Sequence, residues 1–266
     1  MANIVVGSVT EYLERAILET VDGSEIWYRG QRKEETYKLI PSIYREPFKV
    51  EDEIKFFKDF KALSRPYSQK NTNNDWEFYF HMQHYGVPTR LLDWSLDPFV
   101  ALSFALFGNF NEPKSNDSVV PSENAVVYLL NKSNLDAKAL SDYAVEDLST
   151  DKWGDSLLKK EFDILYPSSS NIKQNPTKEI CIPVEPPLIN ERIIAQKGKF
   201  TLFPSTKNVK DIESMLNHQD YLIQKIIIAK EKIPEMKTHL RKLGISKHTL
   251  FPSLESLSNV IKESIL

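Results

Sequence analysis

The chain of 266 residues contains a single cysteine, Cys181. One thiol cannot form an internal disulfide bond, and it cannot supply a set of cysteine ligands for zinc. Its place in the strand-like run from Glu179 to Val184 predicts a small buried hydrophobic residue instead. The sequence therefore excludes disulfide-stapled folds and cysteine-based zinc sites.

The chain also lacks a long apolar run. None of its hydrophobic stretches approaches the ~20 residues that a transmembrane helix requires. The amino-terminal segment has neither the basic region nor the long apolar core of a secretory signal. We therefore expect no membrane association and a cytoplasmic location.

Glycine-rich phosphate-binding loops of the Walker or Rossmann form are absent, and Ser95 is not part of a Gly-x-Ser-x-Gly turn. These absences exclude P-loop enzymes, classical dinucleotide folds and α/β serine hydrolases. A metal site is also disfavoured, because His81 and His84 have no third ligand of suitable spacing near them in the sequence. We expect no bound metal.

Neither sign of charge dominates the chain. A net charge of −3 supplies no overall attraction to nucleic acid or to anionic membranes. Hydrophobic residues make up 41% of the chain and charged residues 27%, which are ordinary values for a globular protein. Because no repeat, low-complexity tract or long linker divides the sequence, we expect one domain that spans residues 1–266.

Helical and extended patterns are interspersed along the chain. Apolar residues recur at helical spacing after Ser8, Asp52 and Asp75, and Asp97 followed by Pro98 marks the start of an apolar, buried helix. Extended segments are expected at residues 25–31, 89–94, 125–130, 179–184, 192–203 and 221–229. This mixture predicts an α+β fold.

Arg29 and Gly30 form the first candidate site, at the end of the extended segment 25–31. A guanidinium group binds phosphate or carboxylate through paired hydrogen bonds, and glycine allows a ligand to approach the backbone closely. The alternative is a strand-end arginine held in a structural ion pair. The segment alone does not choose between them.

A denser polar cluster occupies residues 83–95, where a helix ends and a turn leads into a strand. Such a cluster is costly to fold unless its groups satisfy one another or a ligand. In one interpretation Arg90 pairs with Asp93, and His84 caps its helix. In the other, His84 carries a proton, Arg90 binds an anion and Asp93 orients either one.

Taken together, these segments resemble the FRG domain, a family named for an aromatic-Arg-Gly motif. The resemblance is carried by residues 27–31, 39–45, 83–95 and 101–105. It continues through residues 192–200 and 240–254, so it covers most of the chain.

The chain also has a looser similarity to ADP-ribosyltransferases. Residues 28–30 resemble the Arg-Gly element on the first core strand of those enzymes, and residues 91–95 with the following helix resemble their second motif. Their third motif places a Glu or Gln on a later strand, and Glu191 or Gln196 would stand there. This similarity implies a mainly antiparallel, split β-sheet core flanked by helices, and NAD as a substrate.

We therefore expect an NAD-dependent ADP-ribosyltransferase-like enzyme, a toxin or anti-phage effector that modifies a protein or a nucleic acid. Its expected partner is an antitoxin or a defence-system protein. Arg29 and Arg90 would hold the pyrophosphate, and Glu191, or Asp93 in its place, would stabilise the oxocarbenium charge. The expected catalytic residues are Arg29, His84, Asp93 and Glu191. The expected nucleotide-binding residues are Tyr28, Gly30, Gln31, Thr89, Arg90, Trp94, Ser95 and Gln196.

Two alternatives to this function stay open. The first is a phosphodiester or nucleotide hydrolase that uses His84 as an acid or a base. The second is a non-catalytic domain that senses a nucleotide or a phosphorylated partner in the same pocket.

Overall fold

A computed structural model describes residues 4–18, 23–67, 75–110, 114–143, 180–186, 188, 190–216 and 222–263. Its strands are β1 (Ile4–Val6), β2 (Ile26–Gln31), β3 (Leu91–Ser95), β4 (Ala125–Asn131), β5 (Ile182–Val184), β6 (Gly198–Leu202) and β7 (Ile223–Ile228). Its helices are α1 (Val9–Leu18), α2 (Asp52–Leu63), α3 (Asp75–His84), α4 (Pro98–Phe107), α5 (Lys132–Tyr143), α7 (Glu191–Ala195), α8 (Ile212–Met215), α9 (Ile233–Lys242), α10 (Lys247–Leu250) and α11 (Leu254–Glu263).

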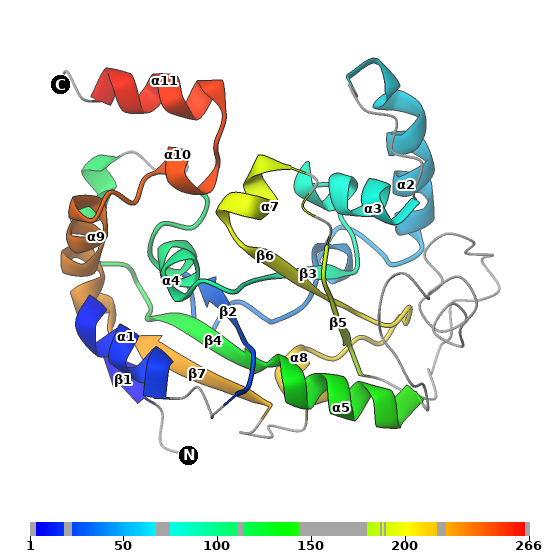
Figure 1. Ribbon diagram of the computed structural model, residues 1–266, viewed down its shortest axis with the longest axis horizontal. Coiled ribbons are helices and arrows are strands. Elements are labelled where there is room, and N and C mark those ends of the chain that lie inside the picture. The colour runs from blue at the N-terminus through cyan, green and yellow to red at the C-terminus, as the bar shows by residue number, and fades with distance from the viewer. Residues whose placement is uncertain are drawn as a thin grey trace.

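Within the described residues, seven strands form one mixed sheet in the order β1-β7-β4-β2-β3-β6-β5 (Figure 1). Strand β1 pairs with β7 in parallel, and the other pairings in this sheet are antiparallel. Helices flank the sheet, which confirms the α+β class. The sheet joins strands from both ends of the chain, because Ile4 stands opposite Ile226.

Strands β2 and β3 are joined by fewer residue pairs than any other two neighbouring strands of the described sheet. The two strands share one register pair, Tyr28 with Ser95. In contrast, β2 pairs with β4 along its whole length, and β3 does the same with β6. Beyond the shared pair, β2 and β3 therefore leave a gap between two well-bonded parts of the sheet.

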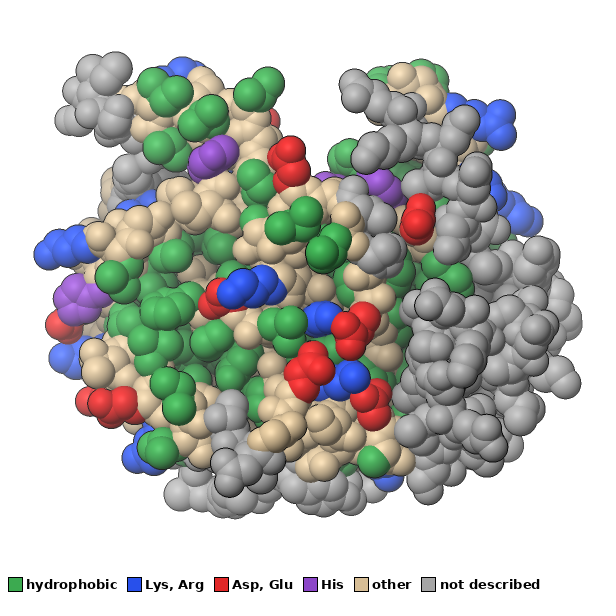
Figure 2. All heavy atoms as spheres, in the orientation of Figure 1, with side chains coloured by type: hydrophobic (Ala, Val, Ile, Leu, Met, Phe, Trp, Pro, Cys, Tyr) green, Lys and Arg blue, Asp and Glu red, His purple; other side chains and the backbone are tan. Residues whose placement is uncertain are grey.

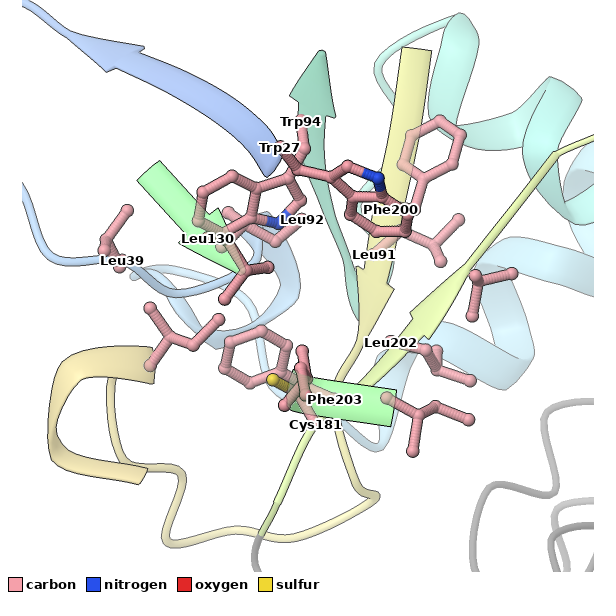
Figure 3. Packing of buried hydrophobic residues seen from close by; sticks show 14 of the residues in the cluster. Trp27, Leu39, Leu91, Leu92, Trp94, Leu130, Cys181, Phe200, Leu202 and Phe203 are labelled. Atoms are coloured by element: carbon pink, nitrogen blue, oxygen red, sulfur yellow. The ribbon is translucent and has the colours of Figure 1, made fainter. Parts of the chain in front are cut away.

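Both faces of the sheet are buried. Successive residues of a strand point to opposite faces, so Trp27 packs in one cluster with apolar side chains of α2, α3, α5 and α8, and Tyr28 packs in the other with side chains of α1, α4 and α9. Figure 3 shows Trp27 in the first cluster, near Trp94, and Cys181 against Phe203. Burial raises the pKa of the Cys181 thiol to about 12, as expected for a cysteine that serves as a small hydrophobic residue. Glu179, where that extended run was expected to begin, lies outside the described residues.

Gly30 allows helix α4 to lie directly against β2. A Cβ atom at Gly30 would stand 1.9 Å from the carbonyl oxygen of Ala101 and 2.5 Å from the amide nitrogen of Ala105. The helix begins as expected, because the Asp97 carboxylate accepts a hydrogen bond of 2.9 Å from the amide of Phe99. The glycine of the aromatic-Arg-Gly segment thus sets the distance between a strand and a helix that border the same gap.

Arg90, just before β3, is a buried cation that is 1% exposed. Its Nε atom donates to Oε2 of Glu53 over 2.7 Å, and its backbone amide donates to Oε1 of the same carboxylate over 2.8 Å. Burial is the largest single influence and lowers the pKa of Arg90, but the charges of Glu53, Tyr79 and Tyr44 and the hydrogen bond to Glu53 together outweigh it, so the net pKa is raised. The Tyr79 hydroxyl also donates to Glu53, so one carboxylate ties α2, α3 and the start of β3 together.

The prediction of an extended segment over residues 192–203 is wrong for its first residues. Residues 191–195 form helix α7, and strand β6 begins only at Gly198. The Asn190 side chain caps this helix by accepting a hydrogen bond of 2.8 Å from the amide of Ile193. Local capping therefore overrides the β-branched composition of Ile193 and Ile194.

We expect Glu53→Gln to lower the free energy of unfolding by about 3–5 kcal/mol, because it leaves the Arg90 guanidinium buried without its counter-charge. Urea denaturation of the purified variant measures this loss. Asp59→Asn is the matched control on the same helix, since it removes an exposed pair between Lys55 and Asp59 that contributes about 0.3–0.5 kcal/mol. Equal effects of the two substitutions would show that the buried pair does not hold β3 in place.

Candidate functional site

A cavity of about 960 Å³ lies where β2 and β3 separate. Its walls come from the ends of β2 and β3, from the carboxyl end of α3, from α4 and α7, and from the segment after α10 (Figure 1). Figure 2 shows the molecule hollowed between the α11 side and the α2 side. The lining residues are Tyr28, Arg29, Gly30, Gln31, Arg32, Tyr37, Ser42, Arg45, Gln83, His84, Tyr85, Gly86, Val87, Asp93, Trp94, Ser95, Val100, Ala101, Phe104, Phe107, Gly108, Asn109, Arg192, Gln196, Phe251, Pro252 and Ser253.

Arg29 bridges the gap between the two strands. Its Nη1 atom donates to the backbone carbonyl of Asp93 over 2.6 Å and lies 3.7 Å from Oδ2 of the same residue. Burial lowers the pKa of Arg29 to about 10, with Asp93 opposing the shift and Arg45 adding to it. The guanidinium therefore keeps its charge at neutral pH, in a place where ordinary strand pairing has ended.

Asp93 is the centre of the charged groups in the cavity. Both of its carboxylate oxygens accept hydrogen bonds from Nε2 of Gln83, at 3.2 and 3.1 Å. Burial lowers the pKa values of Arg45 and Arg192, and the charge of Asp93 opposes the shift in both. The three arginines line one cavity together with Asp93, whose side chain is 56% exposed and lies within 3.7 Å of the Arg29 guanidinium.

The backbone holds the second and third arginines in place. Arg45 donates from Nε and Nη2 to the carbonyl of Ile40, at 3.2 and 2.7 Å. Arg192 donates from Nη1 to the carbonyl of His84 over 3.0 Å, and its guanidinium lies 4.7 Å from the centre of the Phe251 ring. We did not expect either arginine at the site. Both belong to segments that carry the family resemblance, but no sequence spacing relates them to Arg29.

His84 ends helix α3 and lines the cavity. Burial, the positive charge of Arg192 and the neighbouring His81 together lower its pKa to about 4, with burial as the largest cause. The imidazole is therefore neutral at neutral pH. A neutral imidazole with so low a pKa is poorly suited to donate a proton in catalysis.

Unsatisfied polar atoms concentrate at this cavity. Among the described residues, the buried side-chain nitrogen and oxygen atoms without a hydrogen-bond partner are Arg29 Nε, Gln31 Oε1, His84 Nδ1 and Asn190 Nδ2. The first three belong to residues that line the cavity. Buried polar groups are normally paired, so an excess of unpaired ones in one place indicates a site for a polar ligand.

The structure brings together most of the residues expected at the site. The cavity is lined by Tyr28, Arg29, Gly30, Gln31, His84, Asp93, Trp94, Ser95 and Gln196. Thr89, Arg90 and Glu191 are not among the lining residues. Thr89 is buried and donates to Oε1 of Gln83 over 2.6 Å, Arg90 pairs with Glu53 rather than with Asp93, and Glu191 is exposed on the first turn of α7.

Three of the lining residues expected to bind a nucleotide also hold the walls together. Ser95 Oγ donates to the carbonyl of Gln196 over 2.7 Å, and Nε2 of Gln196 donates to the carbonyl of Leu250 over 2.9 Å. Trp94 Nε1 donates to the Thr201 hydroxyl over 3.0 Å. These contacts attach the carboxyl-terminal segment to the sheet, and they engage the amide of the glutamine that we considered for catalysis.

Other kinds of site are not found in the part of the chain that the structure describes. It contains no group of three or more His, Cys, Asp or Glu residues placed to hold a metal ion. It also contains no helix with the length and apolar character needed to cross a membrane.

The family model of the FRG domain matches residues 24–114. This segment includes β2, α2, α3, β3 and α4, and with them Arg29, Arg45, His84 and Asp93. Arg192 and Phe251, which also line the cavity, lie outside it. Neither the curated proteins nor the solved structures contain a match to this chain.

We expect the stability of the protein to fall as pH decreases from about 6.5 to about 4, with His84 as one cause. The unfolded chain protonates this residue near pH 6.5, whereas the folded chain does so only near its pKa of about 4, so the unfolded state binds more protons between these values. Because the ring is partly exposed, the loss amounts to roughly 1–2 kcal/mol. Urea denaturation across this pH range measures it.

His84→Gln should remove this part of the pH dependence, whereas His239→Gln, at an exposed position outside the cavity, should not. A His84→Gln variant that loses stability with acid as steeply as the wild type would contradict the low pKa of His84.

Proposed function

Since the chain contains an FRG domain, we propose that its cavity binds NAD and that the protein transfers ADP-ribose to a macromolecular acceptor. The single observation that carries the proposal is that Arg29, Arg45 and Arg192 line one cavity of about 960 Å³ together with Asp93. A cavity of this size is at the upper end of the range for small-molecule sites, roughly 300–1,000 Å³.

The three arginines would bind the pyrophosphate of NAD. Planar guanidinium groups bind phosphate oxygens through two parallel hydrogen bonds, and such charge-assisted bonds are stronger than neutral ones. The unpaired Nε of Arg29 is a donor of this kind. Arg45 and Arg192 take the part that we first assigned to Arg90, which pairs with Glu53 instead.

The Asp93 carboxylate would stabilise the positive charge that develops when nicotinamide leaves. When the bond between nicotinamide and C1′ of the ribose breaks, its electron pair leaves with nicotinamide, and the ribose acquires oxocarbenium character. A carboxylate near this carbon stabilises the positive charge. A nucleophile of the acceptor then bonds to C1′ and releases its proton. Asp93 is the one carboxylate among the described lining residues, whereas Glu191 is exposed outside them.

Two further observations favour the transferase over a hydrolase. The described strands form one sheet, but the single register pair between β2 and β3 leaves the opening at which the ADP-ribosyltransferase similarity would place NAD. The pKa of His84, about 4, argues against its use as an acid on a phosphate ester at neutral pH. As a toxin or anti-phage effector, the enzyme would find its acceptor in a cell extract, and an antitoxin or defence-system partner would block the release of nicotinamide.

NAD at ~100 times its dissociation constant should stabilise the protein by about 2.7 kcal/mol. This corresponds to a rise in melting temperature of roughly 5–10 °C for a domain of this size. In Arg29→Lys the rise should be clearly smaller, because lysine keeps the charge but loses the planar fork. Arg65→Lys, at an exposed position outside the cavity, is the control and should behave as the wild type.

The reaction itself is tested by incubating the protein with labelled NAD and cell extract. Release of nicotinamide together with labelled macromolecules supports the transferase, and sensitivity of the label to protease or nuclease identifies the acceptor class. Cleavage of phosphate esters without release of nicotinamide would point to the hydrolase. Binding without turnover in extract would point to a sensor domain. Either of these last results would overturn the proposal.

Asp93→Asn should separate binding from catalysis. We expect kcat to fall by roughly 10²–10³-fold, because the amide no longer offers a negative charge to the developing cation. The affinity for NAD should stay the same or rise, because a negative charge leaves the neighbourhood of the pyrophosphate. Nicotinamide release and calorimetric titration measure the two effects, and Asp59→Asn serves as the control. Unchanged kcat in a folded Asp93→Asn protein would remove Asp93 from the reaction.

A further inference from the structure

Among the described residues, three glutamines line the cavity, and two of them form hydrogen bonds that hold its walls. Gln83 accepts at Oε1 from the Thr89 hydroxyl over 2.6 Å and donates from Nε2 to the Asp93 carboxylate. Gln196 donates from Nε2 to a backbone carbonyl over 2.9 Å. Gln31 differs from both, because it is 5% exposed and its buried Oε1 has no hydrogen-bond partner.

The unpaired oxygen of Gln31 is unfavourable for folding. It has lost its hydrogen bonds to water and has gained none from the protein, whereas an apolar side chain of the same length would avoid this cost. We propose that Gln31 binds a hydroxyl group of the ligand beside the anion that Arg29 binds, and so selects a ligand whose phosphate is joined to a sugar. This assignment rests on the proposed function, in which the sugar is a ribose of NAD.

Strand β2 places Gln31 next to Arg29. Residues i and i+2 of a strand point to the same face, and a rise of about 3.4 Å per residue separates their Cα atoms by roughly 7 Å. Pairing with β4 fixes both positions, since Arg29 stands opposite Tyr128 and Gln31 opposite Val126. Nε of Arg29 is also buried without a partner. One strand thus presents an unpaired cationic donor and an unpaired amide oxygen side by side.

The amide of Gln31 is able to turn toward a ligand. The terminal torsion of glutamine is broad, and no hydrogen bond holds Oε1 in its present position. In Gln83, by contrast, the same rotation would break the bonds to Thr89 and Asp93. Binding to Gln31 therefore exchanges an unpaired oxygen for a paired one.

A hydroxyl is the group that best fits this position. It donates and accepts, so it pairs with either atom of the amide, whereas an amino group pairs only with the oxygen and a phosphate only with the nitrogen. In a ribose phosphate the ring hydroxyls lie only a few bonds from the phosphate. The amino groups of adenine and nicotinamide lie beyond the sugar, too far along the ligand for a residue that adjoins Arg29.

The melting temperature of the full chain without ligand tests the first half of this assignment. Gln31→Met keeps the length of the side chain and removes the amide, so we expect a melting temperature equal to or above that of the wild type. Gln83→Met should lower the melting temperature, because it leaves the Thr89 hydroxyl and Asp93 without this partner. If Gln31→Met lowers it as much as Gln83→Met does, the Gln31 amide supports the fold and the assignment is wrong.

Calorimetric titration tests the second half, with NAD and with two NAD analogues that each lack the ring hydroxyls of one ribose. Gln31→Met should bind NAD roughly 3–10-fold more weakly than the wild type, which corresponds to one hydrogen bond. One analogue should lose the same factor with the wild type. It should lose nothing further with Gln31→Met, since the contact is already absent.

Two further variants control this titration. Gln224→Met makes the same change on β7, at a residue that does not line the cavity, and should bind NAD as the wild type does. Gln31→Leu repeats the loss of the amide with a side chain of another shape, and should weaken NAD binding by the same factor as Gln31→Met.

The outcomes separate the role of Gln31 from the proposed function. If NAD binds equally to the wild type and to both Gln31 variants, the hydroxyl site is overturned while the proposed function stands. The same holds if both analogues lose as much affinity with Gln31→Met as with the wild type, because the hydroxyl then bonds elsewhere. If NAD does not bind to the folded wild type, the proposed function and the assignment of Gln31 are both overturned.

Discussion

The buried ion pair between Glu53 and Arg90 is the contact on which the rest of the structure depends. Arg90 immediately precedes β3, and the Glu53 carboxylate accepts hydrogen bonds from both the guanidinium and the backbone amide of Arg90. The same carboxylate accepts a hydrogen bond from the hydroxyl of Tyr79 on α3. A strand start and two helices are therefore fixed relative to one another by one acid in the apolar interior, where an unpaired charge would be strongly unfavourable. Gln83 and Asp93 meet because their elements are held in this way.

The cavity exists because the sheet stops pairing at one place. The pairing between β2 and β3 ends at Tyr28 and Ser95. Beyond this pair, the Arg29 side chain donates a hydrogen bond to the backbone carbonyl of Asp93, in place of the backbone amide that a paired strand would have supplied. Gly30, on the opposite face, brings the backbone of α4 against β2. The site is thus an interruption of regular structure whose backbone groups are satisfied by side chains, which leaves room for a ligand between two firmly paired parts of the sheet.

The sequence was a good guide where local chemistry decides and a poor one where distant partners do. The start of α4 at Asp97 and Pro98 follows from capping alone, and the polar segment 83–95 contributes several lining residues to the cavity. Whether Arg90 or Asp93 faced that cavity depended on Glu53, an acid on another helix, and no local pattern shows such a pairing. Arg192 and Phe251 are beyond local reasoning for the same reason, because only the fold brings them to Arg29.

The pairing of β1 with β7 has a consequence for how the protein is made. Strand β1 cannot pair before Ile226 of β7 has been synthesised. The part of the cavity beside Arg192 is complete only when the segment that includes Phe251 is present. A topology with such high contact order folds slowly, because long loops must close before their contacts stabilise anything. During synthesis the cavity therefore lacks the part of its lining that residues 251–253 supply until these residues have been added to the chain.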